Sequence, residues 1–66
     1  MKSKILKMVL SYLQSKEGLS YERAILRISR VIRTGNYQNN PVLVHLLSVG
    51  LPADPKLLHN LMTPGV

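Results

Sequence analysis

The placement of glycine and proline constrains this chain more than any other feature. All four glycines and all four prolines stand at the edges of apolar segments and leave the interiors uninterrupted. Glycine supplies the left-handed residue that ends a helix, and proline is tolerated in the first helical turn but not in the interior. The chain is therefore predicted to be all-α, a compact bundle of about four short helices forming one small domain over residues 1–66. The expected helices cover residues 3–16, 21–34, 41–49 and 55–62.

Each segment also has an apolar pattern that predicts its buried side. In 3–16 this side is expected to contain Ile5, Leu6, Val9 and Leu13, with Met8 and Tyr12 beside them. In 21–34 it contains Tyr21, Ala24, Ile25, Ile28, Val31 and Ile32. The segment 41–49 is apolar nearly all round, which predicts the buried centre of the domain or half of a dimer contact. In 55–62 the apolar side consists of Leu57, Leu58, Leu61 and Met62.

The net charge of +6 comes entirely from the first half of the chain. Residues 1–33 carry eight basic and two acidic side chains, whereas residues 34–66 carry only Lys56 against Asp54. Such an asymmetry suggests that the first half faces a polyanion or an acidic surface, while the second half supplies core or an oligomer contact.

Four arginines lie on the predicted helix 21–34. At 100° per residue, Arg23, Arg27 and Arg30 point away from the apolar sector, with Arg33 at the margin and Leu26 among them. Like charges three and four residues apart repel, and a bound anion would relieve that repulsion. Because a guanidinium binds phosphate or a guanine edge through two parallel hydrogen bonds, we expect a polyanion-binding face. The competing interpretations are a merely solvated face and an acidic protein partner.

No constellation of catalytic or metal-binding residues is recognisable. The three carboxylates fall where capping or solvation explains them, and His45 and His59 lie on different predicted helices without a ligand cluster. The serines have no nucleophile-elbow context, no glycine-rich phosphate loop is present, and the chain contains no cysteine. We therefore expect no enzymatic activity, no catalytic residue, no metal and no cofactor.

The strings ISRVIRTGNYQNNPVLVHLLSVGLPAD (28–54) and LQSKEGLS (13–20) resemble parts of the Xre/Cro-type helix-turn-helix repressors. In that family a recognition helix containing I-S-R ends in a glycine, and a polar N-P segment leads to an apolar helix with a G-V-P-like stop. The two strings cover a little over half of the chain. Only YERAILR separates them here, so the turn between the two motif helices is missing. The resemblance implies base or phosphate contact by Ser29 and Arg30.

Two functions are expected from these observations. The first is a small DNA-binding protein, a transcriptional regulator that dimerises through residues 41–49 and 55–62 and presents 21–34 to DNA. The arginines would contact phosphate or guanine, and further backbone contacts would come from Lys4, Lys7, Asn36, Gln38 and Asn39. The alternative is a helical adaptor or inhibitor that binds an acidic protein surface, with Tyr21 and Leu26 as its anchors.

Membrane association is the least favoured interpretation. The segment 3–16 has the amphipathicity of a membrane-active peptide, but the chain has neither Trp nor Phe, and 41–49 has no cationic face. The basic and apolar start lacks a small-residue cleavage site, so no secretory signal is expected. We accordingly expect a cytoplasmic protein.

Overall fold

A computed structural model describes residues 2–48 and 50–62 of the chain. It contains four helices, α1 (Lys2–Lys16), α2 (Tyr21–Thr34), α3 (Pro41–Leu47) and α4 (Pro55–Met62). No strand occurs within the described residues. The predicted all-α bundle is therefore confirmed. Three helices end where expected, whereas α3 ends at Leu47, with Ser48 as its C-cap, and Val49 lies outside the described residues.

Side-chain and backbone caps define the helix ends. The Ser20 hydroxyl accepts a hydrogen bond from the Arg23 N–H at the start of α2, at 3.3 Å. Gly35 ends α2 in the left-handed conformation, with φ of 68°, and its N–H donates to the Val31 carbonyl at 2.7 Å. At the start of α3 the Oδ1 of Asn40 accepts from the Leu43 N–H at 3.1 Å.

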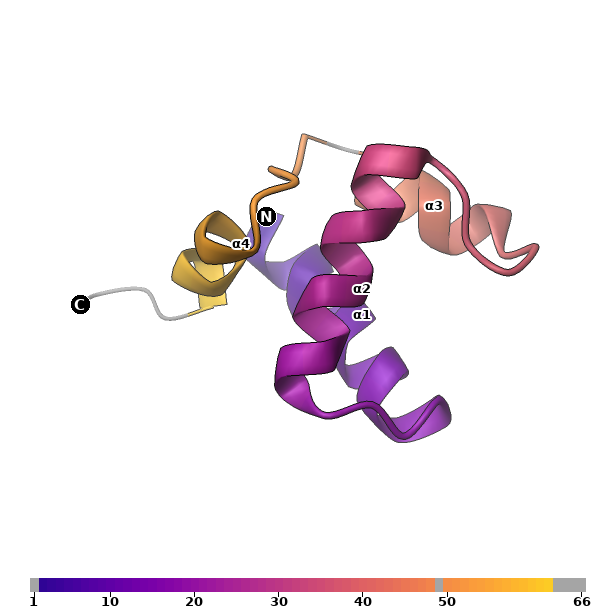
Figure 1. Cartoon of the computed structure of the whole chain (residues 1–66), viewed down its shortest axis with the longest axis horizontal. Helices are drawn as coiled ribbons and strands as arrows, with labels where there is room; N and C mark the ends of the chain where they lie inside the picture. Colours follow the sequence, from indigo (N-terminus) through magenta and orange to yellow (C-terminus); the bar gives the residue numbers. More distant parts are fainter. Residues whose placement is uncertain (1, 49, 63–66) are drawn as a thin grey trace.

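The helix pair α1 and α2 forms the centre of the bundle. In Figure 1, α2 crosses in front of α1, with α3 beyond one edge of the pair and α4 beyond the other. Each of α3 and α4 contacts both central helices, but these two flanking helices share no contact within the described residues. The expectation that 41–49 forms the buried centre is therefore wrong, because α1 already covers the inner face of α2 and leaves α3 at an edge.

The core joins side chains from all four helices. Its buried members on α1 are Leu6, Val9, Leu10 and Leu13, on α2 Ala24, Ile25, Ile28 and Val31, and beyond them Tyr37, Leu43, Leu47, Leu51 and Leu58. Met8 and Tyr12, expected beside the buried side of α1, are exposed instead, and Leu10 takes the buried position. Leu57 is also exposed, because only one side of α4 faces the central pair.

Two polar contacts join loops to the central helices. Ser29 is buried on α2, and its hydroxyl donates a hydrogen bond to the carbonyl of Ala53, just before α4. Tyr37 is buried beyond the end of α2, and its hydroxyl donates to the Glu17 carboxylate at the end of α1. These contacts fix both long connections of the chain against the α1–α2 pair.

Candidate nucleic-acid interface

The exposed side of α2 carries the four arginines, which we call the arginine face (Arg23, Arg27, Arg30 and Arg33). Arg23, Arg30 and Arg33 are exposed and Arg27 is half-buried. The opposite side of α2 enters the core, so the helical periodicity separates cations from apolar residues as predicted. Leu26 lies among the arginines with 58% of its surface exposed.

Arg27 differs from the other arginines because Tyr37 holds it. Its guanidinium carbon lies 5.8 Å from the centre of the Tyr37 ring, within the range of a cation–π interaction. The same ring is oriented by the hydrogen bond between its hydroxyl and Glu17. Three residues that are distant in sequence therefore form a chain of contacts from Glu17 through Tyr37 to Arg27. The guanidinium of Arg27 is positioned before any partner arrives.

This environment perturbs the Tyr37 phenol. Burial raises the pKa of Tyr37 above its usual value of 10.0, and the hydrogen bond and negative charge of Glu17 raise it further. The neighbouring Arg27 acts in the opposite direction, because a cation favours the phenolate. The net effect keeps Tyr37 protonated and able to donate to Glu17.

The loop after α2 folds back beside the helix. Gly35 reverses the chain, and the Asn40 N–H then donates to the Tyr37 carbonyl at 2.7 Å to close a tight turn. Gln38 and Asn39 occupy the two central positions with φ of 39° and 58°. Positive φ at both positions is typical of a type I′ turn and is uncommon for a glutamine. The turn places residues 36–38 next to the last two turns of α2.

A surface hollow of about 400 Å³ lies between the end of α2 and this loop. We call it the arginine hollow, and it is lined by Arg27, Arg30, Val31, Thr34, Asn36, Tyr37 and Gln38. Four of the nine residues predicted to contact DNA, Arg27, Arg30, Asn36 and Gln38, therefore meet around one hollow. Two arginines and no carboxylate line it, so it is suited to an anion.

The remaining predicted residues lie elsewhere. Arg23 and Arg33 extend the arginine face along α2 but do not line the arginine hollow. Lys4 and Lys7 are exposed on α1, and Lys7 lines a separate hollow with Tyr21 and Met62. Both helices direct their buried sides at the shared core, so the exposed lysines of α1 lie on the side of that helix turned away from the core. The two lysines consequently do not extend the arginine face.

The two recognition positions implied by the helix-turn-helix resemblance differ in their exposure. Arg30 is exposed on the arginine face and available to a partner. Ser29 is only 3% exposed, and its hydroxyl is already bound to the Ala53 carbonyl. Contact between Ser29 and DNA is therefore contradicted in this fold, and its role is to hold the segment before α4 against α2.

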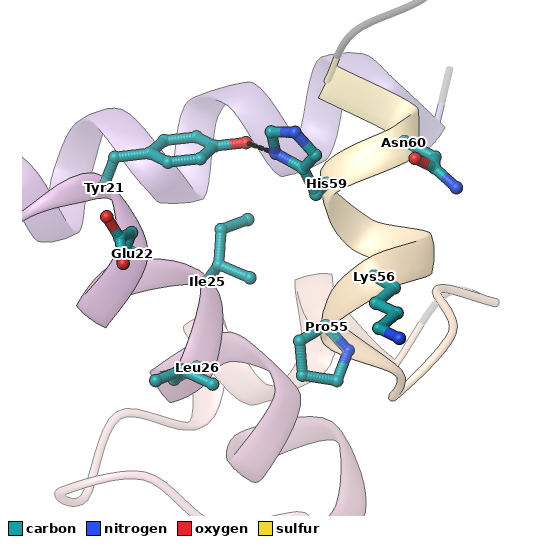
Figure 2. Close-up of a pocket in the computed structure, with 8 residues that line it drawn as sticks. All are labelled: Tyr21, Glu22, Ile25, Leu26, Pro55, Lys56, His59 and Asn60. Carbon is teal, nitrogen blue, oxygen red and sulfur yellow. Dashed lines mark hydrogen bonds between the residues drawn. The ribbon is translucent and has the colours of Figure 1, made fainter.

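A second hollow, of about 480 Å³, brings together the two residues predicted to anchor a protein partner. We call it the α2–α4 hollow, and Figure 2 draws the residues that line it: Tyr21, Glu22, Ile25, Leu26, Pro55, Lys56, His59 and Asn60. The Tyr21 hydroxyl and the Nδ1 of His59 form a hydrogen bond of 2.8 Å between the two helices. Leu26 and Pro55 stand at the opposite end of the hollow (Figure 2).

Sequence reasoning missed Tyr37, which connects the loop to both central helices. The sequence signal for it is a single aromatic side chain inside the polar string GNYQNNP. A large aromatic side chain in such a loop indicates that the loop packs against the core. The buried tyrosine shows that the loop is packed, and the packed loop is what makes the arginine hollow.

The described residues hold no group of three or more His, Cys, Asp or Glu side chains arranged for a metal ion. In this part of the chain no helix has both the length and the apolar character required to span a bilayer. Comparisons with protein-family models, curated proteins and solved structures found no match to this chain.

Proposed function

We propose that this protein binds DNA through the arginine face and the adjoining arginine hollow, and that it acts as a transcriptional regulator. The observation that carries the proposal is the meeting of Arg27, Arg30, Asn36 and Gln38 around one hollow that contains no carboxylate. Guanidinium and amide groups are both donors that proteins offer to phosphate oxygens.

The charge balance at the hollow favours a phosphate. The C-terminal end of α2 borders it and carries the negative end of the helix dipole, equivalent to about half an elementary charge. Arg27 and Arg30 contribute two full positive charges at the same place. The two arginines therefore outweigh the dipole.

The length of the arginine face also suits a polyanion. Arg23 and Arg33 are ten residues apart, which corresponds to about 15 Å along the axis of α2. Duplex DNA carries one negative charge per ~1.7 Å of its axis, so several phosphates fall within this span. The closely spaced arginines repel one another in the free protein and would be neutralised together in the complex.

The test is fluorescence anisotropy of a labelled duplex of random sequence, titrated at several salt concentrations with two charge-matched variants. Arg30→Gln removes one cation from the arginine hollow, whereas Lys4→Gln removes one cation from α1. Arg30→Gln is expected to weaken binding and to reduce the slope of log affinity against log salt by about 1, since one phosphate contact is lost. Lys4→Gln should leave that slope near the wild-type value. Equal effects of the two variants, or no binding of the folded protein at low salt, would contradict the proposal.

A second candidate function is supported by the α2–α4 hollow. In this alternative the protein is an adaptor or inhibitor, and an apolar side chain of an acidic partner enters the hollow beside Leu26, which is 58% exposed. Leu26→Ala separates the two functions, because it removes the apolar anchor and leaves every cation in place. Loss of partner capture in this variant, with unchanged affinity for duplex DNA, would favour the adaptor.

A further inference from the structure

Exposed apolar side chains gather on one surface of the molecule. Five large apolar side chains are exposed within the described residues, and three of them, Met8, Tyr12 and Val42, lie around a single hollow between α1 and α3. Their exposed fractions are 54%, 40% and 67%. Contiguous apolar surface of this kind marks an interaction site more often than scattered exposed residues do.

The hollow is also free of charge. Its volume is about 250 Å³, and its lining consists of Met8, Val9, Tyr12, Asn40, Val42, Leu43 and Leu46. Asn40 is the one residue in this set with a polar amide, and its side chain already caps α3. We call these seven residues the apolar surface. It shares no residue with the arginine hollow or the α2–α4 hollow, both of which carry charged side chains.

The distribution of charge on the chain favours a second copy as the partner at the apolar surface. A foreign partner of a chain with a net charge of +6 would gain most from carboxylates placed opposite its cations, and the apolar surface offers no cation to receive them. A second copy carries the same +6 and would be repelled wherever cations face one another. None of the seven lining residues is a cation, so two copies can meet through the apolar surface while Lys4 and Lys16, one helical turn beyond Met8 and Tyr12 on α1, stay at its exposed rim.

We propose that two copies of this chain form a two-fold dimer through the apolar surface. In such a dimer the same patch is used twice, so that Val42 of each copy lies against the α1–α3 hollow of its partner. Tyrosine and methionine are enriched in interfaces, and methionine adapts its shape to irregular gaps. Dimerisation through residues 41–49 and 55–62 together is excluded as one contiguous patch, because α3 and α4 flank opposite edges of the central pair. The interface instead combines α3 with α1.

The proposal is tested by sedimentation equilibrium of the whole chain over a range of concentrations. The wild-type protein is expected to have twice the 7.4 kDa mass of one chain. Val42→Glu places a carboxylate against the apolar α1–α3 hollow of the partner copy and should return the mass to that of one chain. Val42 is well exposed in the monomer and lies in the first turn of α3, where the helix dipole favours an anion, so this variant should fold. Met8→Glu provides a second test from α1.

Leu57→Glu is the matched control, since it makes the same charge change at an exposed leucine of α4 outside the apolar surface. It should remain dimeric. A wild-type chain that is monomeric up to about 1 mM, where even weak association is visible, would overturn the proposal. A folded Val42→Glu protein that stays dimeric would do the same. Salt provides a further check: screening of the two +6 copies should strengthen the dimer, and a dimer that dissociates as salt rises would be held by charge rather than by the apolar surface.

Discussion

At the scale of single residues, Tyr37 joins the loop after α2 to both central helices. Its buried ring supports Arg27, and its hydroxyl reaches Glu17, twenty residues earlier in the chain. The residue therefore couples the geometry of the arginine hollow to the end of α1. A change at Tyr37 is expected to affect both the stability of the fold and the position of a guanidinium.

Tyr37→Phe keeps the ring and removes the hydroxyl that donates to Glu17. The free energy of unfolding is expected to fall by about 1 kcal/mol at neutral pH, because a partly buried hydrogen bond to a carboxylate is lost. Urea unfolding followed by circular dichroism measures the change. Tyr12→Phe is the control, since Tyr12 is 40% exposed in one copy. At protein concentrations where the chain is monomeric, it should alter stability little.

Tyr37 also predicts a response to alkaline pH. Below its usual pKa of 10.0 the phenol is protonated in both folded and unfolded chains, so the stability that it contributes is fully present. Its folded pKa is raised, so above pH 10.0 the unfolded chain releases the proton first, and stability is lost as pH rises through the folded pKa. Unfolding midpoints measured on both sides of pH 10.0 should fall less steeply in Tyr37→Phe than in the wild type. An identical alkaline fall in both proteins would contradict this assignment.

At the scale of elements, the ends of the helices could be predicted from sequence because local chemistry sets them. Ser20 and Gly35 delimit α2 at the predicted bounds 21–34, and Pro41 and Pro55 open α3 and α4. These signals act over a few residues, so no tertiary information is required.

The sides of the helices were harder to predict, because burial depends on which neighbour covers each side. Periodicity on α1 is compatible with Tyr12 or Leu10 at the edge of the buried stripe, and only the position of α2 and the flanking helices decides for Leu10. The arginine hollow also depends on tertiary contacts. Its arginines could be predicted from the sequence, whereas the position of its loop residues 36–38 depends on the contact of Tyr37 with Glu17.

The short helix α3 depends on its N-cap. It has only seven residues, too few to be helical without tertiary support and capping. Asn40→Ala removes the acceptor of the Leu43 N–H and should lower the free energy of unfolding by about 1 kcal/mol. Asn40→Asp keeps an acceptor at this position and adds an anion favoured by the helix dipole. Because Asn40 also lines the apolar surface, the comparison is made at protein concentrations where the chain is monomeric, and there the variant should stay near wild-type stability. Urea denaturation of the wild type and the two variants measures these free energies of unfolding. An equal loss of stability in both variants would argue against a capping role for Asn40.

At the scale of the whole molecule, the charge asymmetry has opposite effects on folding and on binding. The arginines repel one another in the free protein, and dissolved ions screen that repulsion. The same ions compete with the protein for DNA phosphates in the proposed complex. A single variable, the salt concentration, should therefore stabilise the fold and weaken the complex.

Arg30→Gln tests this link, because Arg30 has arginines three residues before and after it on α2. Raising sodium chloride should increase the free energy of unfolding of the wild type by a few tenths of a kcal/mol per like-charged pair, and by less in Arg30→Gln. Lys56→Gln, which removes the isolated cation of the second half, should retain the wild-type salt response. Unfolding at low and high salt measures all three. A salt response that Lys56→Gln reduces as much as Arg30→Gln would assign the effect to net charge alone.

The separation of α3 from α4 has a consequence for how the chain reaches its final form. Each flanking helix rests on the α1–α2 pair and makes no contact with the other among the described residues, so neither provides a surface on which the other must assemble. Once the central pair has formed, α3 can dock before α4 or after it. We therefore expect two alternative orders of assembly, in which a defect that delays one flanking helix leaves the other free to dock.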